Sequence, residues 1–235
     1  VQTCALPIST FVVMTIVSAV VATTGLLSNS AAVIIGAMII APVMGPAISA
    51  SVGSVLYDPK LFRRGVGLQI LGVLLAIVSA LVFSLLLKET LLVPPGFDPL
   101  TVPQVQERLV PNVLSLVIAI GAGVAAVFSL TRGVSSVLVG AMIAVALVPP
   151  AATVGIGIAW NDPLAVVEAG TLLLVNLLAV NLVALGLLWL SGYRPIEEER
   201  VGTARRRTIL TAGVIVVALL LLSSVLIAIS ALSIV

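Results

Sequence analysis

Histidine is absent from the 235 residues of this chain, and cysteine occurs once, as Cys4. Imidazole acid–base catalysis, histidine metal sites and a disulfide within the chain are therefore excluded. Charged side chains are also scarce, at 9% of the residues, whereas 61% are hydrophobic and the mean hydropathy is +1.35. Because such a composition cannot cover a surface that faces water, it excludes a soluble globular domain and predicts a polytopic membrane protein whose first partner is the lipid bilayer.

Apolar runs long enough to cross a membrane, which takes roughly 20 residues, fill most of the chain. The continuous runs of Leu, Val, Ile and Ala lack the alternation of β-barrel strands, so we expect every span to be a helix. The predicted fold is an all-α polytopic membrane helix bundle with seven spans, at roughly 7–27, 31–56, 65–87, 111–131, 134–158, 166–190 and 209–234.

The first residues, VQTCALPIS, include neither an initiator methionine nor the basic segment of a signal peptide. We interpret this beginning as truncated and expect a soluble N-terminal region to be missing from the sequence. Any regulation that such a region exerts on the membrane part would lie outside these residues.

Lysine and arginine are distributed unequally between the two sides that alternating spans define. Two of them, Lys88 and Arg108, fall on one side, and nine fall on the other. Because positively charged loops stay in the cytoplasm, we assign the side with nine to the cytoplasm. We therefore expect a cytoplasmic N-terminus and an external C-terminus. We interpret the run RPIEEERVGTARRR, residues 194–207, as an ordinary cytoplasmic loop, with a site for anionic lipid headgroups as the alternative. The nine residues on the cytoplasmic side are Lys60, Arg63, Arg64, Arg132, Arg194, Arg200, Arg205, Arg206 and Arg207.

The chain repeats part of itself at an offset of 104 residues. Between 33–59 and 137–163, ten of the 27 aligned positions are identical, and they include glycines, prolines and an aspartate. The clearest match is Gly-Ala-Met-Ile, which begins at Gly36 and again at Gly140. Because each copy sits within a unit of three spans, an odd number, the second unit is expected to be inverted in the membrane relative to the first.

The repeat divides the chain into parts. The dipeptide Asp-Pro ends both copies, at 58–59 and 162–163. Aspartate at the N-cap with proline at the first helical position is a favourable helix start, so we interpret both aspartates as caps and not as catalytic groups. We predict a first three-helix repeat at 7–90, a second, inverted three-helix repeat at 111–190, a cytoplasmic basic loop at 191–207 and one extra C-terminal helix at 208–235.

Prolines interrupt the second and the fifth predicted spans. Each proline removes a backbone N–H and crowds the preceding turn, which frees the carbonyl four residues earlier. Freed carbonyls must be packed inside protein or line a polar cavity, because lipid offers them no partner. Broken helices of inverted repeats form the sites of many secondary transporters, so we predict a mid-membrane site where residues 38–49 face residues 142–153. The alternative is that the prolines and nearby small residues only let helices approach closely.

Charged groups are also missing from the centres of the predicted spans. A proton relay is therefore not expected, and a coupling ion would be held by carbonyls and hydroxyls, which suit Na⁺. Neutral polar side chains in or beside the spans are Ser28, Asn29, Ser30, Ser49, Ser51, Gln69, Asn112, Ser135, Ser136, Thr153, Asn176 and Asn181, and by default they join helices. The candidate substrate-binding residues are Asn29, Met38, Pro42, Pro46, Ser49, Met142, Val145, Pro149, Pro150, Thr153 and Asn176.

Enzymatic motifs are missing from the sequence. The spans hold no paired aspartates for a protease, no nucleophile can pair with histidine, and no glycine-rich loop with lysine can bind phosphate. We therefore expect no enzymatic activity, no cofactor, no metal site and no nucleic-acid partner.

Two segments, SNSAAVIIGAMIIAPVMGPAISASVGSVLYD at 28–58 and SSVLVGAMIAVALVPPAATVGIG at 135–157, carry a family resemblance. The chain resembles, over roughly residues 10–190, the uncharacterised hydrophobic-domain proteins of bacteria and archaea called domain of unknown function 389. The resemblance implies a location in the plasma or inner membrane of a bacterium or an archaeon. It implies no substrate or activity, and some relatives look as if they carry a soluble N-terminal region.

Two functional hypotheses follow from the repeat and the prolines. The first is a secondary transporter or permease for an unknown small solute or ion, with its site between the two proline-broken helices. The second is a non-transporting membrane scaffold or sensor whose soluble N-terminal region is missing. Assembly into a homo-oligomer is left open by the sequence.

Overall fold

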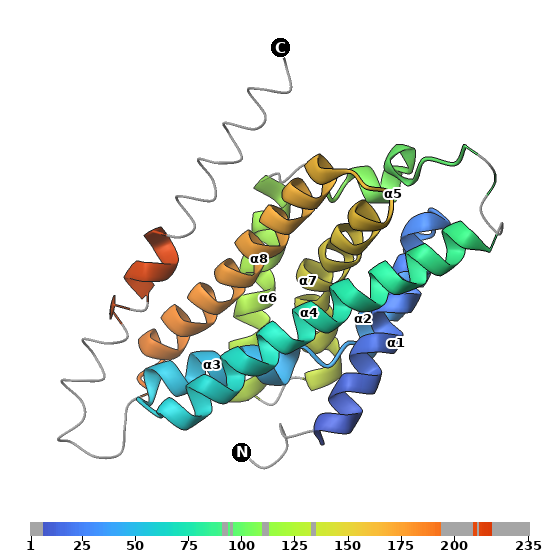
Figure 1. Ribbon diagram of the computed structural model, residues 1–235. Helices are drawn as coiled ribbons and strands as arrows, with labels where there is room; N and C mark the ends of the chain where they lie inside the picture. The colour runs from blue at the N-terminus through green and yellow to red at the C-terminus, as the bar shows by residue number, and fades with distance from the viewer. Residues whose placement is uncertain are drawn as a thin grey trace.

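The computed structural model describes residues 7–90, 94, 96–109, 113–132, 135–193, 209–210 and 212–217. Every regular element among them is a helix, which confirms the all-α prediction (Figure 1). The elements are α1 (Ile8–Leu27), α2 (Ala31–Ile40), α3 (Met44–Val55), α4 (Pro59–Glu89), the short 3₁₀ helix η2 (Pro99–Thr101), α5 (Pro103–Gln106), α6 (Val113–Arg132), α7 (Ser136–Ala159) and α8 (Pro163–Leu190).

Five of the described helices are long and apolar enough to cross a membrane: α1, α4, α6, α7 and α8. The pair α2 and α3 makes a sixth span if its two bent halves are counted together. The seventh predicted span, 209–234, lies mostly outside the described residues, of which 209–210 and 212–217 are helical. The structure therefore supports membrane insertion through five or six helices.

Outward-facing side chains on these helices are large and apolar. On α4, the exposed residues Leu74, Val78, Val82 and Leu85 are three or four positions apart and so share one face of the helix. In a soluble domain such a stripe would face the core, whereas here it is on the outside of the bundle. An apolar outer surface over apolar helices is the arrangement that a lipid environment favours.

Helix starts follow the two Asp-Pro pairs, as the sequence predicts. Asp58 accepts hydrogen bonds at Oδ1 from the backbone N–H groups of Lys60, at 2.9 Å, and Leu61, at 3.0 Å. Asp162 accepts one from the N–H of Ala165, at 2.9 Å. These caps lengthen the helices beyond the apolar runs, so α4 begins at residue 59 instead of 65 and α8 at 163 instead of 166.

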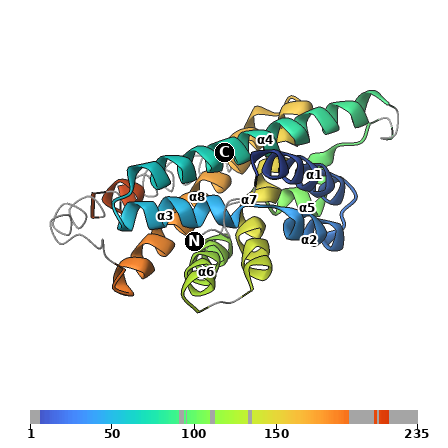
Figure 2. The same cartoon turned by 90° about the horizontal axis from the view of Figure 1, so that it is seen from below.

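The helices form two sets of three. One set is α1, the pair α2–α3 and α4, and the other is α6, α7 and α8. Within each set, every member contacts the other two. The sets meet mainly where α4 packs along α7, with further contacts of α1 and α2 with α7 and of α3 with α8. Figure 1 shows that α4 and α8 run in opposite directions. Figure 2 shows α4 on one side of the bundle and α6 on the other, with α7 between them.

Small residues allow close approach along the central α4–α7 contact. A Cβ on Gly155 of α7 would lie 2.7 Å from the Cβ of Ala80 and 2.8 Å from the carbonyl oxygen of Ile77, both on α4. The two backbones could not approach so closely with any larger residue at this position. Since α7 is also the most deeply buried of the five long helices, it forms the centre of the described bundle.

Candidate functional site

The second span is interrupted between α2 and α3, which are inclined to each other by 53°. Ala41, the residue after α2, has φ −64° and ψ 123°, an extended conformation. It precedes Pro42, whose ring disfavours the helical conformation in the residue before it. The 10 residues of α2 rise about 15 Å, which is half of the roughly 30 Å thickness of a hydrocarbon core. The predicted interruption at Pro42 is confirmed.

The fifth span does not break, and the expectation of a second proline-broken helix is wrong. Helix α7 continues through Pro149 and Pro150. These prolines cannot bond the carbonyls of Val145 and Ala146, but the Nδ2 group of Asn176 donates to the Ala146 carbonyl at 2.9 Å. A side chain from the neighbouring helix α8 thus replaces one of the two lost helical bonds, which lets the helix continue.

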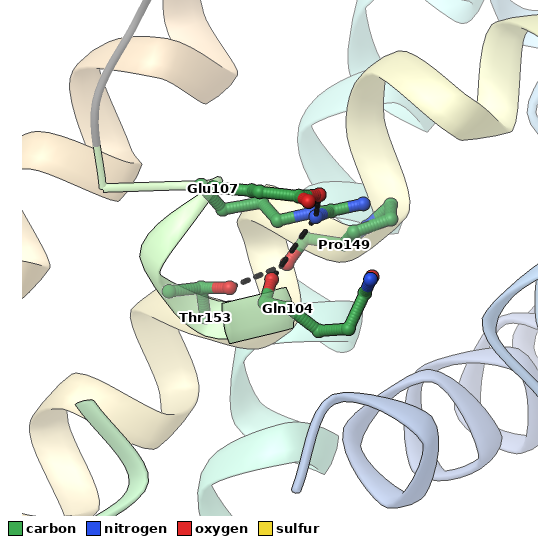
Figure 3. A network of polar contacts seen from close by, with 5 residues as sticks. Gln104, Glu107, Pro149 and Thr153 are labelled. Atoms are coloured by element: carbon green, nitrogen blue, oxygen red, sulfur yellow. Dashed lines mark hydrogen bonds and ion pairs between the residues drawn. The ribbon is translucent and has the colours of Figure 1, made fainter. Parts of the chain in front are cut away.

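Two further hydroxyls bond backbone carbonyls near the prolines. Thr153, fully buried, donates from Oγ1 to the Pro149 carbonyl at 3.0 Å, as Figure 3 shows. Ser18 of α1 donates from Oγ to the carbonyl of Ala37 in the last turn of α2, at 2.7 Å. The helical partner of that carbonyl would be the N–H of residue 41, which is the extended residue after the end of α2. The sequence did not single out Ser18, since a serine in an apolar helix carries no sign of its partner.

A cavity of about 30 Å³ lies beside the break, and we call it the break cavity. It has room for one or two water molecules. The hydroxyls of Thr15 and Ser18 at its wall already donate to backbone carbonyls, so neither hydroxyl proton is free to bind a ligand there. Its described lining is Phe11, Thr15, Ser18, Ala41, Pro42, Val43, Pro46, Ala47, Leu68, Gln69, Gly72, Val73, Ala76, Leu147, Val148, Ala151 and Leu177.

A second, larger cavity of about 560 Å³ lies between α3, α4, α8 and the helical residues near 210–215, and we call it the Gln69 cleft. Gln69 and Leu177 line both cavities, so the two spaces share a wall. The described lining of the cleft is Ala50, Ser51, Ser54, Phe62, Val66, Gln69, Ile70, Leu177, Leu178, Asn181, Leu185, Leu210, Val214 and Ile215.

Two amide side chains meet at this shared wall. Gln69 of α4 donates from Nε2 to Oδ1 of Asn181 at 3.1 Å, and Asn181 of α8 donates from Nδ2 to Oε1 of Gln69 at 3.3 Å. The same Nδ2 group also donates to the Leu177 carbonyl at 2.7 Å, and Ser51 donates to the Asn181 carbonyl at 3.5 Å. Both amides belong to the neutral polar set of the sequence, but neither is among the candidate binding residues. The two residues are 112 positions apart, so no local sequence pattern could predict that they pair.

The structure brings some predicted residues to the break and places others elsewhere. Pro42 and Pro46 line the break cavity, whereas Met142 and Val145 are 44% and 36% exposed on the outside of α7 and do not face it. Helix α7 instead contributes Leu147, Val148 and Ala151 to the cavity, so residues from both segments, 38–49 and 142–153, line it.

The remaining predicted residues do not line either cavity. Asn29 is exposed in the turn before α2, with a φ of 52°, at the opposite end of α2 from the break. Met38 is buried in an apolar cluster with Ala144 and Val148 of α7. Ser49 is half-buried in α3. Asn176 is 3% exposed, and its Oδ1 atom lacks a hydrogen-bond partner among the described residues.

Charged ligands for an ion are not gathered anywhere in the described ranges. No three side chains of the types His, Cys, Asp and Glu come together there. An ion held in either cavity would therefore meet neutral oxygens and amides from the lining residues. The site as described is a backbone break between α2 and α3 beside a small cavity, and the paired amides of Gln69 and Asn181 separate this cavity from a wider cleft.

Comparison with known proteins places the chain among relatives of undetermined activity. The chain is 31% identical, over 198 residues, to the uncharacterized protein MJ0678 of Methanocaldococcus jannaschii. The match covers 83% of this chain and 58% of that protein, so the chain spans little more than half the length of this relative. No solved structure matches the chain. Residues 38–182, which include the break, most of the first copy of the repeat and all of the second, match a family profile, and the chain belongs to the family described as domain of unknown function (DUF389).

Proposed function

We propose that the chain is the membrane part of a secondary transporter or permease for a small solute, whose path runs through the break cavity and the Gln69 cleft. The observation that carries the proposal is the interruption of α2–α3 at Pro42, beside a cavity walled by α7. A broken backbone is tolerated at membrane depth where it is buried in protein or lines a cavity, and secondary transporters use such breaks as binding sites.

Features that an inverted repeat would produce also support this proposal. The turns after α3 and α7 have the same geometry: Tyr57 and Asn161, 104 positions apart, both have a φ of 58°. In both turns the aspartate N–H donates at 2.9 Å to the carbonyl of a glycine five residues earlier, Gly53 or Gly157. Together with the opposite directions of α4 and α8 in Figure 1, these turns favour two homologous units in opposite orientations.

The orientation that we propose follows from the basic residues. Arginine and lysine gather at the end where α3 meets α4, at Lys60, Arg63 and Arg64. We place this end in the cytoplasm, in the plasma or inner membrane, with the N-terminus on the same side. The Gln69 cleft, whose lining includes Phe62 near that end, would then open toward the cytoplasm. A seventh span through 209–234 would bring the C-terminus to the outside.

A non-transporting scaffold or sensor is the second candidate, and the break cavity is the observation that favours it. At about 30 Å³ the cavity holds little more than water, and the hydroxyls of Thr15 and Ser18 at its wall are bonded to backbone. A transporter with this geometry is closed at mid-membrane and must rearrange to pass a solute. A scaffold need not rearrange.

Flux measured in proteoliposomes separates the two candidates. Purified protein is reconstituted and the entry of ²²Na⁺, ³⁶Cl⁻, glycerol and urea is compared with that of empty vesicles. Transport of at least one probe is expected, and Pro42→Ala, which lets α2 continue into α3, is expected to reduce it. The matched control is Pro163→Ala, because Pro163 is the first residue of α8, where an N–H has no helical partner, and it lines neither cavity. Vesicles that match empty ones for every probe would favour the scaffold.

A further inference from the structure

We infer that the Gln69 cleft binds an uncharged small solute that carries a hydrogen-bond donor beside an acceptor, and that the Gln69–Asn181 pair is its polar contact. This inference rests on the proposed transport function and names the class of solute. Alcohols, amides and ureas are compounds of this kind. The inference depends on the volume of the cleft, the charge of its lining and the unused hydrogen-bonding groups of the amide pair.

The volume of the cleft suits a ligand site. At about 560 Å³ it falls within the roughly 300–1,000 Å³ that small-molecule pockets occupy, whereas the break cavity does not. Pockets of this kind are mostly apolar with a few polar groups that orient the ligand. The cleft follows that pattern, because aliphatic side chains and Phe62 surround Ser51, Ser54, Gln69 and Asn181.

Charge determines the class of solute. Among the described residues that line the cleft and the break cavity, none carries an ionisable side chain. An ion that entered this apolar space would lose its hydration without gaining an opposite charge, which is strongly unfavourable. An uncharged polar solute loses far less, because neutral hydrogen bonds replace those it made with water.

The amide pair leaves suitable groups unused. A primary amide has two N–H donors and two acceptor lone pairs. Asn181 uses both of its donors, on Gln69 and on the Leu177 carbonyl. Gln69 uses one donor and one lone pair on Asn181, so one N–H and one lone pair remain on the same side chain. Gln69 can therefore donate to and accept from one solute at the same time.

A purely structural role for the pair, as a link between α4 and α8, explains these observations less well. Amide bonds between helices are common in membrane proteins and contribute little each, so they need no cavity beside them. Here Gln69 lines two cavities, and it lies ten residues into α4, about 15 Å from the start of that helix. A solute moving between the cleft and the break must pass this side chain.

Stopped-flow light scattering on proteoliposomes tests the inference, with glycerol and urea as uncharged probes and ²²Na⁺ and ³⁶Cl⁻ flux as charged ones. Glycerol or urea is expected to enter faster than into empty vesicles, and the two ions are not. Gln69→Leu is expected to slow this entry by at least about fivefold, the effect of losing one neutral hydrogen bond in the path. Gln104→Leu makes the same substitution in α5, outside both cavities, and is expected to leave entry unchanged.

A cysteine variant tests the same site without removing the amide. In a Cys4→Ser background, Ser51→Cys places a thiol of nearly the same size in the wall of the cleft. Benzyl methanethiosulfonate, an uncharged reagent, is expected to modify this thiol and to reduce glycerol entry, and glycerol is expected to slow the modification. Ser191→Cys, on the exposed turn after α8, is the control whose modification should leave entry unchanged.

The outcomes separate the inference from the proposed function. Entry of ions but not of glycerol or urea overturns the inference and leaves the transport function standing. Glycerol entry that neither Gln69→Leu nor the modified Ser51→Cys variant reduces overturns the assignment of the site. Vesicles that behave as empty ones toward all four probes overturn both proposals.

Discussion

Helices α2–α3 and α7 carry the same repeat and the same number of prolines, yet one is broken and the other is continuous. Aligned at the 104-residue offset, Pro46 falls on Pro150, whereas Pro42 falls on Ala146. The break occurs at Pro42, the position at which α7 has no proline. The comparison teaches that the position of a proline, and not the number of prolines, determines where a spanning helix ends.

The partner of the freed carbonyl is the second difference. In α7 the carbonyl of Ala146 is bonded by Asn176, from a helix that packs along its length. In α2 the bond from Ser18 goes to Ala37, in the last turn of the helix, and so stabilises an end instead of bridging a gap. In α7 the donor bonds the carbonyl that the proline leaves without a partner, and the helix continues. In α2 the donor bonds a carbonyl of the last helical turn, and the helix ends there.

The largest expected effect comes from pushing α7 away from α4. Gly155→Val places side-chain atoms where Ala80 and Ile77 already lie, and we expect a loss of about 3 kcal/mol in the free energy of unfolding from overpacking. Thermal unfolding in detergent micelles measures it. The control is Gly186→Val on α8, where no atom lies within 4 Å of an added Cβ. Equal effects of the two variants would show that close α4–α7 packing does not hold α7 in place.

The next largest loss of stability is expected from replacing Asn176. Asn176→Leu leaves the Ala146 carbonyl without its side-chain donor, which we expect to cost about 1–2 kcal/mol of unfolding free energy. In a Pro150→Ala background the cost should fall, because residue 150 then supplies its own N–H to that carbonyl. A double-mutant cycle of unfolding midpoints measures the coupling. Additive effects would mean that Asn176 does not compensate for the proline.

The aspartate caps of α4 and α8 test a feature that the two units share. Asp58→Ala and Asp162→Ala each remove bonds to the first turn of a helix, and we expect each to cost about 1 kcal/mol. Because the two turns share one geometry, the two losses should be similar when unfolding is followed by circular dichroism. A difference of several-fold between them would argue that the turns are not equivalent.

The smallest effect is expected at the proline that both copies share. Pro46 lies in the first turn of α3, where a backbone N–H has no helical acceptor, so Pro46→Ala should change the unfolding free energy by less than about 0.5 kcal/mol. The same thermal unfolding assay measures it. Destabilisation as large as that of Asn176→Leu would show that Pro46, and not Pro42, sets the break.

Features that depend on neighbouring residues could be predicted from the sequence. The Asp-Pro caps and the end of α2 before Pro42 follow from steric and hydrogen-bonding rules that act within a few residues. The apolar runs likewise predicted the helices. The described residues contain five candidate spans, or six if α2 and α3 are counted as one, and the predicted run 209–234 is described only at 209–210 and 212–217.

Features that depend on distant partners could not be predicted. The continuity of α7 requires Asn176, 30 residues beyond Ala146, and the wall between the two cavities requires Gln69 to meet Asn181 across 112 residues. The outward direction of Met142 and Val145 depends on which face of α7 packs against α4. No local pattern specifies such pairings.

The two matched turns have a mechanical consequence. In each turn one residue has a left-handed backbone conformation, the aspartate N–H is bonded to a glycine carbonyl of the preceding helix, and the aspartate side chain caps the following helix. The pairs α3–α4 and α7–α8 therefore form stiff hairpins. The residues 41–43 have no such bracing, because they lie between helix ends. Within the described part of the bundle, bending between α2 and α3 is therefore expected at residues 41–43, while each hairpin keeps its own shape.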